Sequence, residues 1–136
     1  MTPERVVPHR TLRLLLVLVY AAFIFGFGVA DFGPFPVPEG LPLDKIEHLL
    51  AFGGFAWVVE LALLELSAVR RRALAVLTSS SCGLLLELVQ SALPHRSAEL
   101  LDLVADVLGA LLAVGASTLV SWWLGQRGDG AAPHRT

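Results

Sequence analysis

The sequence contains little charge, since only 16% of its 136 residues are Asp, Glu, Lys or Arg. A soluble domain carries roughly 25%, so this composition excludes an ordinary soluble protein. With 55% hydrophobic residues and a mean hydropathy of +0.70, the chain has the composition of a membrane protein. Cysteine is scarce too: the single Cys82 excludes a disulfide framework and a thiolate metal site. A net charge of −2, with no basic cluster interleaved with aromatic residues, excludes nucleic acid as a partner.

The sequence does contain four apolar segments long enough to cross a hydrocarbon core, which takes about 20 residues. They are residues 11–30, 45–66, 73–93 and 102–124. The first is expected to be a retained helix, because its apolar core is longer than the roughly 7–15 residues of a cleaved signal sequence. The sequence therefore predicts an all-α integral membrane bundle of four transmembrane helices, residues 1–124. A flexible cytoplasmic tail, residues 125–136, is expected to follow because it is rich in glycine and polar residues.

Basic residues are segregated along the chain. All of them except Lys45 and Arg96 lie before or at the start of the first segment, between the second and third, or after the fourth. The positive-inside rule assigns that side to the cytoplasm. We therefore expect both termini in the cytoplasm. Trp122 and Trp123 then lie at the inner interface, where aromatic rings prefer to sit.

Polar and ionisable residues recur at the opposite, outer ends of the last three segments. A charge in a bilayer costs about 2.5–3.5 kcal/mol on insertion scales, so such residues are usually paired and functional. At about 1.5 Å per residue, Glu87 lies roughly 9 Å and Asp106 roughly 6 Å below the outer ends of their helices. The sequence thus predicts one shallow, outward-facing polar pocket built from three helices. Its expected residues are Asp44, Lys45, His48, Glu87, Gln90, Arg96, Asp102 and Asp106.

Other polar residues are expected to be structural. Asp44 is a good N-cap for the second helix, besides sharing a helix face with His48. Glu60 and Glu65 are interpreted as structural, with Glu65 expected to pair with the arginine run at residues 70–72. The serines at 79–81 are expected to bond back to carbonyls of their own helix.

Small residues recur every four positions along the fourth segment, at Ala105, Gly109 and Ala113. Such a stripe lets helices approach closely in lipid. Gly53 and Gly54 are expected to do the same on the second segment. Close packing of these two helices would bring the outer polar residues within reach of one another.

The order and spacing of these residues resemble the VanZ-like family of small bacterial membrane proteins. The resemblance runs from Pro42 to about Gly115. It begins with Asp-Lys-x-x-His, continues with Glu-x-x-Gln-x-x-x-Pro-x-Arg and ends with Asp, then usually Asn, then Gly. In this chain the motifs are Asp44-Lys45-Ile46-Glu47-His48, Glu87-Leu88-Val89-Gln90-Ser91-Ala92-Leu93-Pro94-His95-Arg96, and Asp102, Asp106 and Gly109. The departure is Asp106, where the family usually carries Asn.

The resemblance implies a multi-pass protein of the inner (plasma) membrane that acts in the cell envelope. The family takes its name from a member associated with teicoplanin resistance, so a link to glycopeptide resistance is what the resemblance implies. On this interpretation the partner is a membrane lipid or a lipid-linked envelope precursor, and a homo-oligomer is compatible with the sequence. An outer pocket holding Lys45 and Arg96 suits phosphate, because the arginine fork bonds bidentately.

The same residues leave other functions open. In an enzyme, His48 oriented by Asp44 would act as general base, with Glu87 or Asp106 as acid. No serine or cysteine nucleophile stands beside His48 in any motif, so no catalytic residue is assigned. On ligand type, Glu87, Asp102 and Asp106, with or without His48, would allow a hard cation. Their spacing matches no specific metal motif, so we predict neither a metal nor a cofactor. An ion conductor would need polar groups through the full membrane depth. A purely structural polar layer would instead hold the helices together through interhelical hydrogen bonds.

Overall fold

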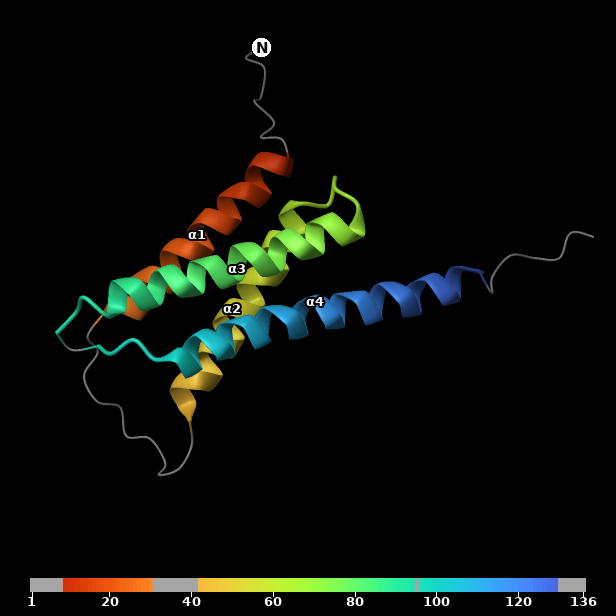
Figure 1. Ribbon diagram of the computed structural model, residues 1–136. Helices are drawn as coiled ribbons and strands as arrows, with labels where there is room; N and C mark the ends of the chain where they lie inside the picture. Colours follow the sequence, from red (N-terminus) through yellow and green to blue (C-terminus); the bar gives the residue numbers. More distant parts are fainter. Residues whose placement is uncertain (1–8, 31–41, 95, 130–136) are drawn as a thin grey trace, which may run out of the picture.

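A computed structural model describes residues 9–30, 42–94 and 96–129, and within these residues all regular structure is helical. Successive helices run in roughly opposite directions, and the C-terminal part of α4 extends beyond the other three helices (Figure 1). Their bounds are α1 His9–Val29, α2 Leu43–Ala62, α3 Ala68–Gln90 and α4 Leu100–Asp129. The prediction of an all-α bundle of four helices is confirmed.

Polar side chains mark two levels of the bundle, which we name after one residue each. The His48 end contains the starts of α2 and α4 and the ends of α1 and α3. The Glu60 end contains the starts of α1 and α3, the end of α2 and the middle of α4. Lys45 and Arg96 lie at the His48 end, whereas Arg13 and the arginine run lie at the Glu60 end. The described basic residues are therefore segregated in space as they are in sequence.

Three of the helices, α1, α3 and α4, are long and apolar enough to cross a membrane. The expected second span, α2, is not among them, because its 20 residues include Asp44, Lys45, Glu47, His48 and Glu60. The apolar part of α2 is the most enclosed part of the structure. Phe52, Phe55 and Val59 form its core with Ile24 of α1 and Leu86 of α3. In contrast, Phe23, Leu88, Leu112 and Leu119 of the other helices are at least 60% exposed, as side chains facing lipid would be.

The closest approach of two helices is between α2 and α4. Gly53 and Gly109 face each other there, and a Cβ added to Gly53 would lie 3.0 Å from the carbonyl oxygen of Gly109. No larger residue would allow this contact without moving a backbone. The prediction that small residues bring these two helices together is confirmed for Gly53 and Gly109, whereas Gly54 faces Tyr20 of α1.

Three local predictions need correction. Pro42, and not Asp44, is the N-cap of α2; Asp44 is inside the first helical turn, where its carboxylate faces the positive end of the helix dipole. The arginine run belongs to the first turns of α3 and does not form a connection. α4 continues to Asp129, so residues 125–129, which were assigned to a flexible tail, are helical. The remainder of the expected tail and the proline-rich connection before Leu41 lie outside the described residues.

Candidate functional site

Lys45 connects α2 to the start of α4 at the His48 end. Its Nζ lies 2.6 Å from Asp44 Oδ2, 2.6 Å from Glu99 Oε2 and 2.7 Å from Asp102 Oδ1. Asp102 is buried and the other two carboxylates are half exposed. The ammonium group donates to Asp44 and Glu99 and forms an ion pair with Asp102, so three carboxylates already surround it.

His48 and Asp106 form the second polar contact of the site. His48 Nδ1 lies 2.8 Å from Asp106 Oδ1, and the Asp106 side chain is fully buried. We expected Asp44 to orient His48, and that was wrong: Asp44, four residues earlier on the same helix, bonds Lys45 instead. An ionised carboxylate can only accept, so opposite it Nδ1 is the donor, and Nε2 is then the nitrogen that can accept a proton or bind an ion.

Glu87 enters the site from α3. One carboxylate oxygen, Oε2, accepts a hydrogen bond from the backbone N–H of Glu99 at 2.9 Å. The other, Oε1, is buried and accepts no hydrogen bond from the described residues. Glu99 was not among the predicted site residues although it bonds both Glu87 and Lys45. Its position directly before the first turn of α4, where its carbonyl accepts from the Asp102 and Leu103 N–H groups, is the feature that could have identified it.

Gln90 and Arg96 link the site to the end of α1. Gln90 Nε2 donates to the Gly28 carbonyl at 2.9 Å, and Arg96 Nη2 donates to the Ala30 carbonyl at 3.0 Å. Gln90 is buried, whereas Arg96 is exposed in the connection between α3 and α4. The remaining guanidinium donors of Arg96 are therefore accessible from outside the bundle.

A cavity of about 290 Å³ opens beside these residues. Five of the predicted residues line it: Asp44, His48, Gln90, Arg96 and Asp102. Lys45, Glu87 and Asp106 are not in its lining, although each contacts or adjoins a residue that is. The opposite wall is apolar and includes Phe23, Ile24, Phe27, Phe52 and Leu86. The cavity thus combines a polar end with an aromatic wall supplied largely by α1.

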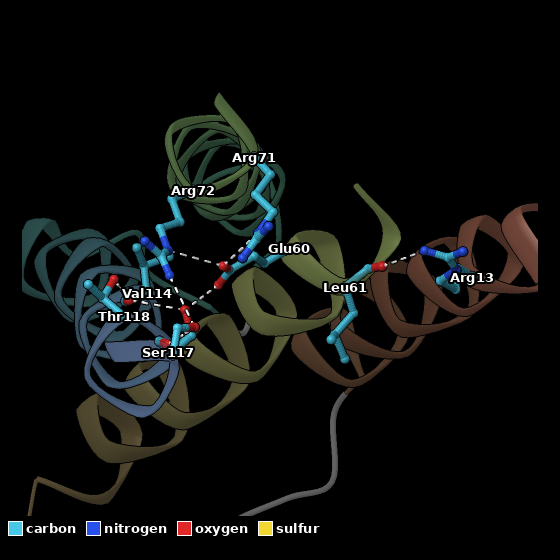
Figure 2. Close-up of polar contacts among 9 residues, drawn as sticks. Arg13, Glu60, Leu61, Arg71, Arg72, Val114, Ser117 and Thr118 are labelled. Atoms are coloured by element: carbon cyan, nitrogen blue, oxygen red, sulfur yellow. Dashed lines mark hydrogen bonds and ion pairs between the residues drawn. The ribbon is translucent and has the colours of Figure 1, made fainter. Parts of the chain in front are cut away.

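A second polar cluster lies at the Glu60 end (Figure 2). The buried Glu60 accepts from Arg71 Nε at 3.1 Å, from Arg72 Nε at 3.3 Å and from Ser117 Oγ at 2.6 Å. Glu65 was expected to pair with the arginine run, but it pairs with Arg13 at 3.1 Å. Glu60, and not Glu65, contacts the arginine run, because Glu60 lies on α2 and faces both α3 and α4. Glu65 lies beyond the end of α2. With its three donors, this cluster is an interhelical clamp.

Ser79 of α3 forms a hydrogen bond with α2 between the His48 end and the Glu60 end. Its hydroxyl donates to the Phe52 carbonyl of α2 at 2.8 Å, and not to its own helix as expected. Ser79 is fully buried, so this bond satisfies a hydroxyl that would otherwise be costly in the core.

The VanZ/LLP1 family model matches residues 6–121 of this sequence. The match covers all four helices except the C-terminal turns of α4, and the chain belongs to this family. The chain matches no curated protein and no solved structure.

Proposed function

We propose that this VanZ/LLP1 membrane protein binds the phosphate-bearing headgroup of a membrane lipid or lipid-linked envelope precursor in the cavity at the His48 end. The observation that carries the proposal is the cavity itself, because its lining changes from aromatic residues of α1 to His48, Gln90 and Arg96. A molecule with a polar head and an apolar chain has the same two-part chemistry. Pockets that combine apolar walls with a few placed polar groups are typical of small-molecule sites.

Arg96 would contact the phosphate. Its guanidinium uses one donor on the Ala30 carbonyl and is otherwise exposed at the mouth of the cavity. A planar guanidinium bonds two phosphate oxygens at once, which a lysine cannot do. Lys45 is a poor candidate for this contact because three carboxylates already surround its ammonium group.

We further propose that the chain crosses the bacterial plasma membrane four times, with both termini in the cytoplasm and the cavity facing outward. Arg13, Arg71 and Arg72 at one end support this orientation through the positive-inside rule. α2 would cross as the enclosed helix, since Lys45, His48 and Glu60 each have partners on other helices. Ser67, between α2 and α3, would then lie on the cytoplasmic side. If a Ser67→Cys variant in a Cys82→Ser background can be labelled from outside intact cells, the proposed orientation is wrong.

Native mass spectrometry of the purified protein tests the binding proposal. We expect retention of an anionic phospholipid, phosphatidylglycerol, or of a polyprenyl phosphate over phosphatidylcholine, and the two anionic probes separate the two sources of phosphate. Arg96→Gln should weaken retention by about 10- to 100-fold, the value of a charge-assisted hydrogen bond of about 1.5–3 kcal/mol. Arg13→Gln, at the other end of α1, is the matched control. Equal retention by wild type and Arg96→Gln would contradict the proposal.

A second candidate is a membrane-embedded enzyme acting on a lipid-linked substrate. The observation that favours it is the 2.8 Å contact between His48 and the buried Asp106, with His48 also lining the cavity. A carboxylate that holds an imidazole in one tautomer leaves Nε2 able to take a proton from a substrate or water. Turnover of a polyprenyl phosphate by wild type and its loss in His48→Gln would favour the enzyme. Binding without turnover favours the first proposal.

Binding of an envelope precursor or headgroup would change how lipoglycopeptides reach the outer face of the plasma membrane. This effect would connect the cavity to teicoplanin-type resistance. This connection rests on family membership and on the proposed outward orientation. Susceptibility should change in a strain that expresses wild type and not in one that expresses Arg96→Gln at equal abundance.

A further inference from the structure

Three side chains of metal-binding type converge from three different helices beside the cavity. His48 of α2, Glu87 of α3 and Asp102 of α4 each offer one ligand atom, and these atoms lie within 4.8 Å of one another. Ligand atoms of a tetrahedral ion with bonds of about 2.0–2.2 Å lie about 3.3–3.6 Å apart. Small side-chain rotations therefore suffice to close the three groups around one ion.

The surroundings of His48 match those of a metal ligand. Metal-bound histidines almost always donate their other ring N–H to a carboxylate, a backbone carbonyl or a water, which fixes the tautomer and raises the basicity of the ligating nitrogen. His48 Nδ1 meets Asp106 Oδ1 at 2.8 Å, and Asp106 is fully buried. Nε2 is the nitrogen left to bind an ion.

Glu87 supplies an independent indication. Its side chain is 94% buried, yet Oε1 accepts no hydrogen bond from the described residues. A buried carboxylate oxygen without a donor is costly, and a cation is one of the few groups that compensates it. Oε2 is held by the backbone N–H of Glu99, which fixes the carboxylate beside His48 and Asp102.

Charge points the same way. Three buried carboxylates, Glu87, Asp102 and Asp106, gather at this end. Among the described residues, the basic side chains that contact them are Lys45 and His48. The positive charge of Lys45 is shared among Asp102 and the half-exposed Asp44 and Glu99. It therefore does not neutralise the negative charge of Glu87. The excess negative charge falls where the three ligand atoms converge.

We infer that His48, Glu87 and Asp102 bind one divalent transition-metal cation, with Asp106 holding His48 in place and open coordination positions toward the cavity. A mixed imidazole and carboxylate set suits ions such as Zn²⁺ and Mn²⁺, whereas Mg²⁺ and Ca²⁺ prefer sites made of oxygen alone. The inference deepens the proposed function and in that part rests on it, because the ion would be the second group to meet the phosphate, opposite Arg96. It also removes a difficulty: without a cation, this carboxylate cluster would repel an anionic headgroup.

Co²⁺ is the probe for the site, because its visible absorption reports the geometry and number of its ligands. The purified full chain in detergent, freed of metal by a chelator, should take up about one Co²⁺ per chain, displaced by Zn²⁺. Glu87→Gln and His48→Gln should each lower the affinity at least 100-fold. Asp106→Asn should lower it about 10- to 100-fold, as loss of an outer partner does.

Glu65→Gln is the control, because Glu65 lies at the other end of the bundle in an exposed pair with Arg13, where loss of the charge costs little stability. It should bind Co²⁺ like the wild type. If Glu87→Gln fails to fold, His48→Gln and the wild-type stoichiometry still decide the question. Wild type without stoichiometric Co²⁺ or Zn²⁺, or with Mg²⁺ or Ca²⁺ alone, overturns the inference, and so does unchanged binding in both ligand variants.

Lipid retention with and without chelator separates this inference from the proposed function. Stoichiometric Co²⁺ without retention of any phosphate lipid supports the metal site and contradicts the proposed function. Retention that persists without bound metal contradicts the metal site and supports the proposed function. Retention that requires the metal and Arg96 together supports both.

Discussion

Replacing Gly109 with alanine should push α2 away from α4 and loosen the polar site. The new Cβ would lie 2.9 Å from the carbonyl carbon of Leu49 and 3.1 Å from the nitrogen of Gly53, where ordinary contacts need at least 3.4 Å. These neighbours are backbone atoms, which cannot rotate aside. The Leu49 carbonyl oxygen lies closer still to the new Cβ, so α2 must move away from α4, because an overpacked core relieves such clashes by backbone shifts. His48 precedes Leu49 and Asp106 lies one turn before Gly109, so the shift falls on their contact.

Gly115→Ala, on the same helix, is the control for the change in unfolding free energy caused by Gly109→Ala. A Cβ at 115 meets nothing within 4 Å, so Gly115→Ala only gains helix propensity, about 0.8–1.0 kcal/mol. Gly109→Ala gains the same propensity and loses about 1–3 kcal/mol to overpacking. The gain is common to both variants. The difference between their unfolding free energies is therefore about 1–3 kcal/mol in favour of Gly115→Ala.

Unfolding in mixed micelles with increasing dodecyl sulfate, followed by tryptophan fluorescence, measures this difference. Gly109→Ala should unfold at lower detergent fraction than wild type, and Gly115→Ala at the same or a higher fraction. Equal stability of the two variants would show that α2 and α4 do not meet at this glycine pair, and the geometry of the His48 end would then be wrong as well.

Glu60→Gln should lower membrane abundance strongly, since breaking a buried ion pair costs about 3–5 kcal/mol, whereas Glu65→Gln, at an exposed pair, should cost less than about 1 kcal/mol; equal abundance of the two would refute the clamp at the Glu60 end. Arg96→Gln should keep normal abundance and lose the envelope phenotype, because its exposed site can be rehydrated. Glu87→Gln should lose part of both, because Glu87 is buried. Quantitative immunoblots beside lipoglycopeptide susceptibility measure both variants, and normal values for both would remove the cavity from any role in resistance.

The fold could be predicted from the sequence because the length of an apolar segment is a local feature. The ends of the helices were harder to predict from the sequence. Residues 125–129 have the composition of a tail, yet they continue α4, since an established helix extends one residue at a time at little cost. α2 could be identified by its apolar centre, but its charged ends set it apart from the three helices that are long and apolar enough to cross a membrane.

The sequence predicted which polar residues lie at the His48 end, but it did not predict which of them contact one another. Helical spacing places Asp44 and His48 on one face, which suggested that they pair. Which neighbour each one meets depends on how α2 crosses α4, and the contact of Gly53 with Gly109 fixes that crossing. At that crossing Lys45 faces the start of α4 and His48 faces Asp106, one turn deeper.

Gly83 and Asp106 belong to different helices yet depend on each other. A Cβ at 83 would lie 2.9 Å from Asp106 Cγ, so a larger residue on α3 would displace the carboxylate from His48. The VanZ-like pattern usually has Asn where this chain has Asp106, and an amide oxygen of nearly the same shape can accept the same bond from Nδ1. A carboxylate, however, also stabilises positive charge on or beside the imidazole, which an amide does not. Asp106→Asn should therefore preserve packing and abundance while weakening any cation held at His48. A loss of abundance instead would assign Asp106 to folding alone.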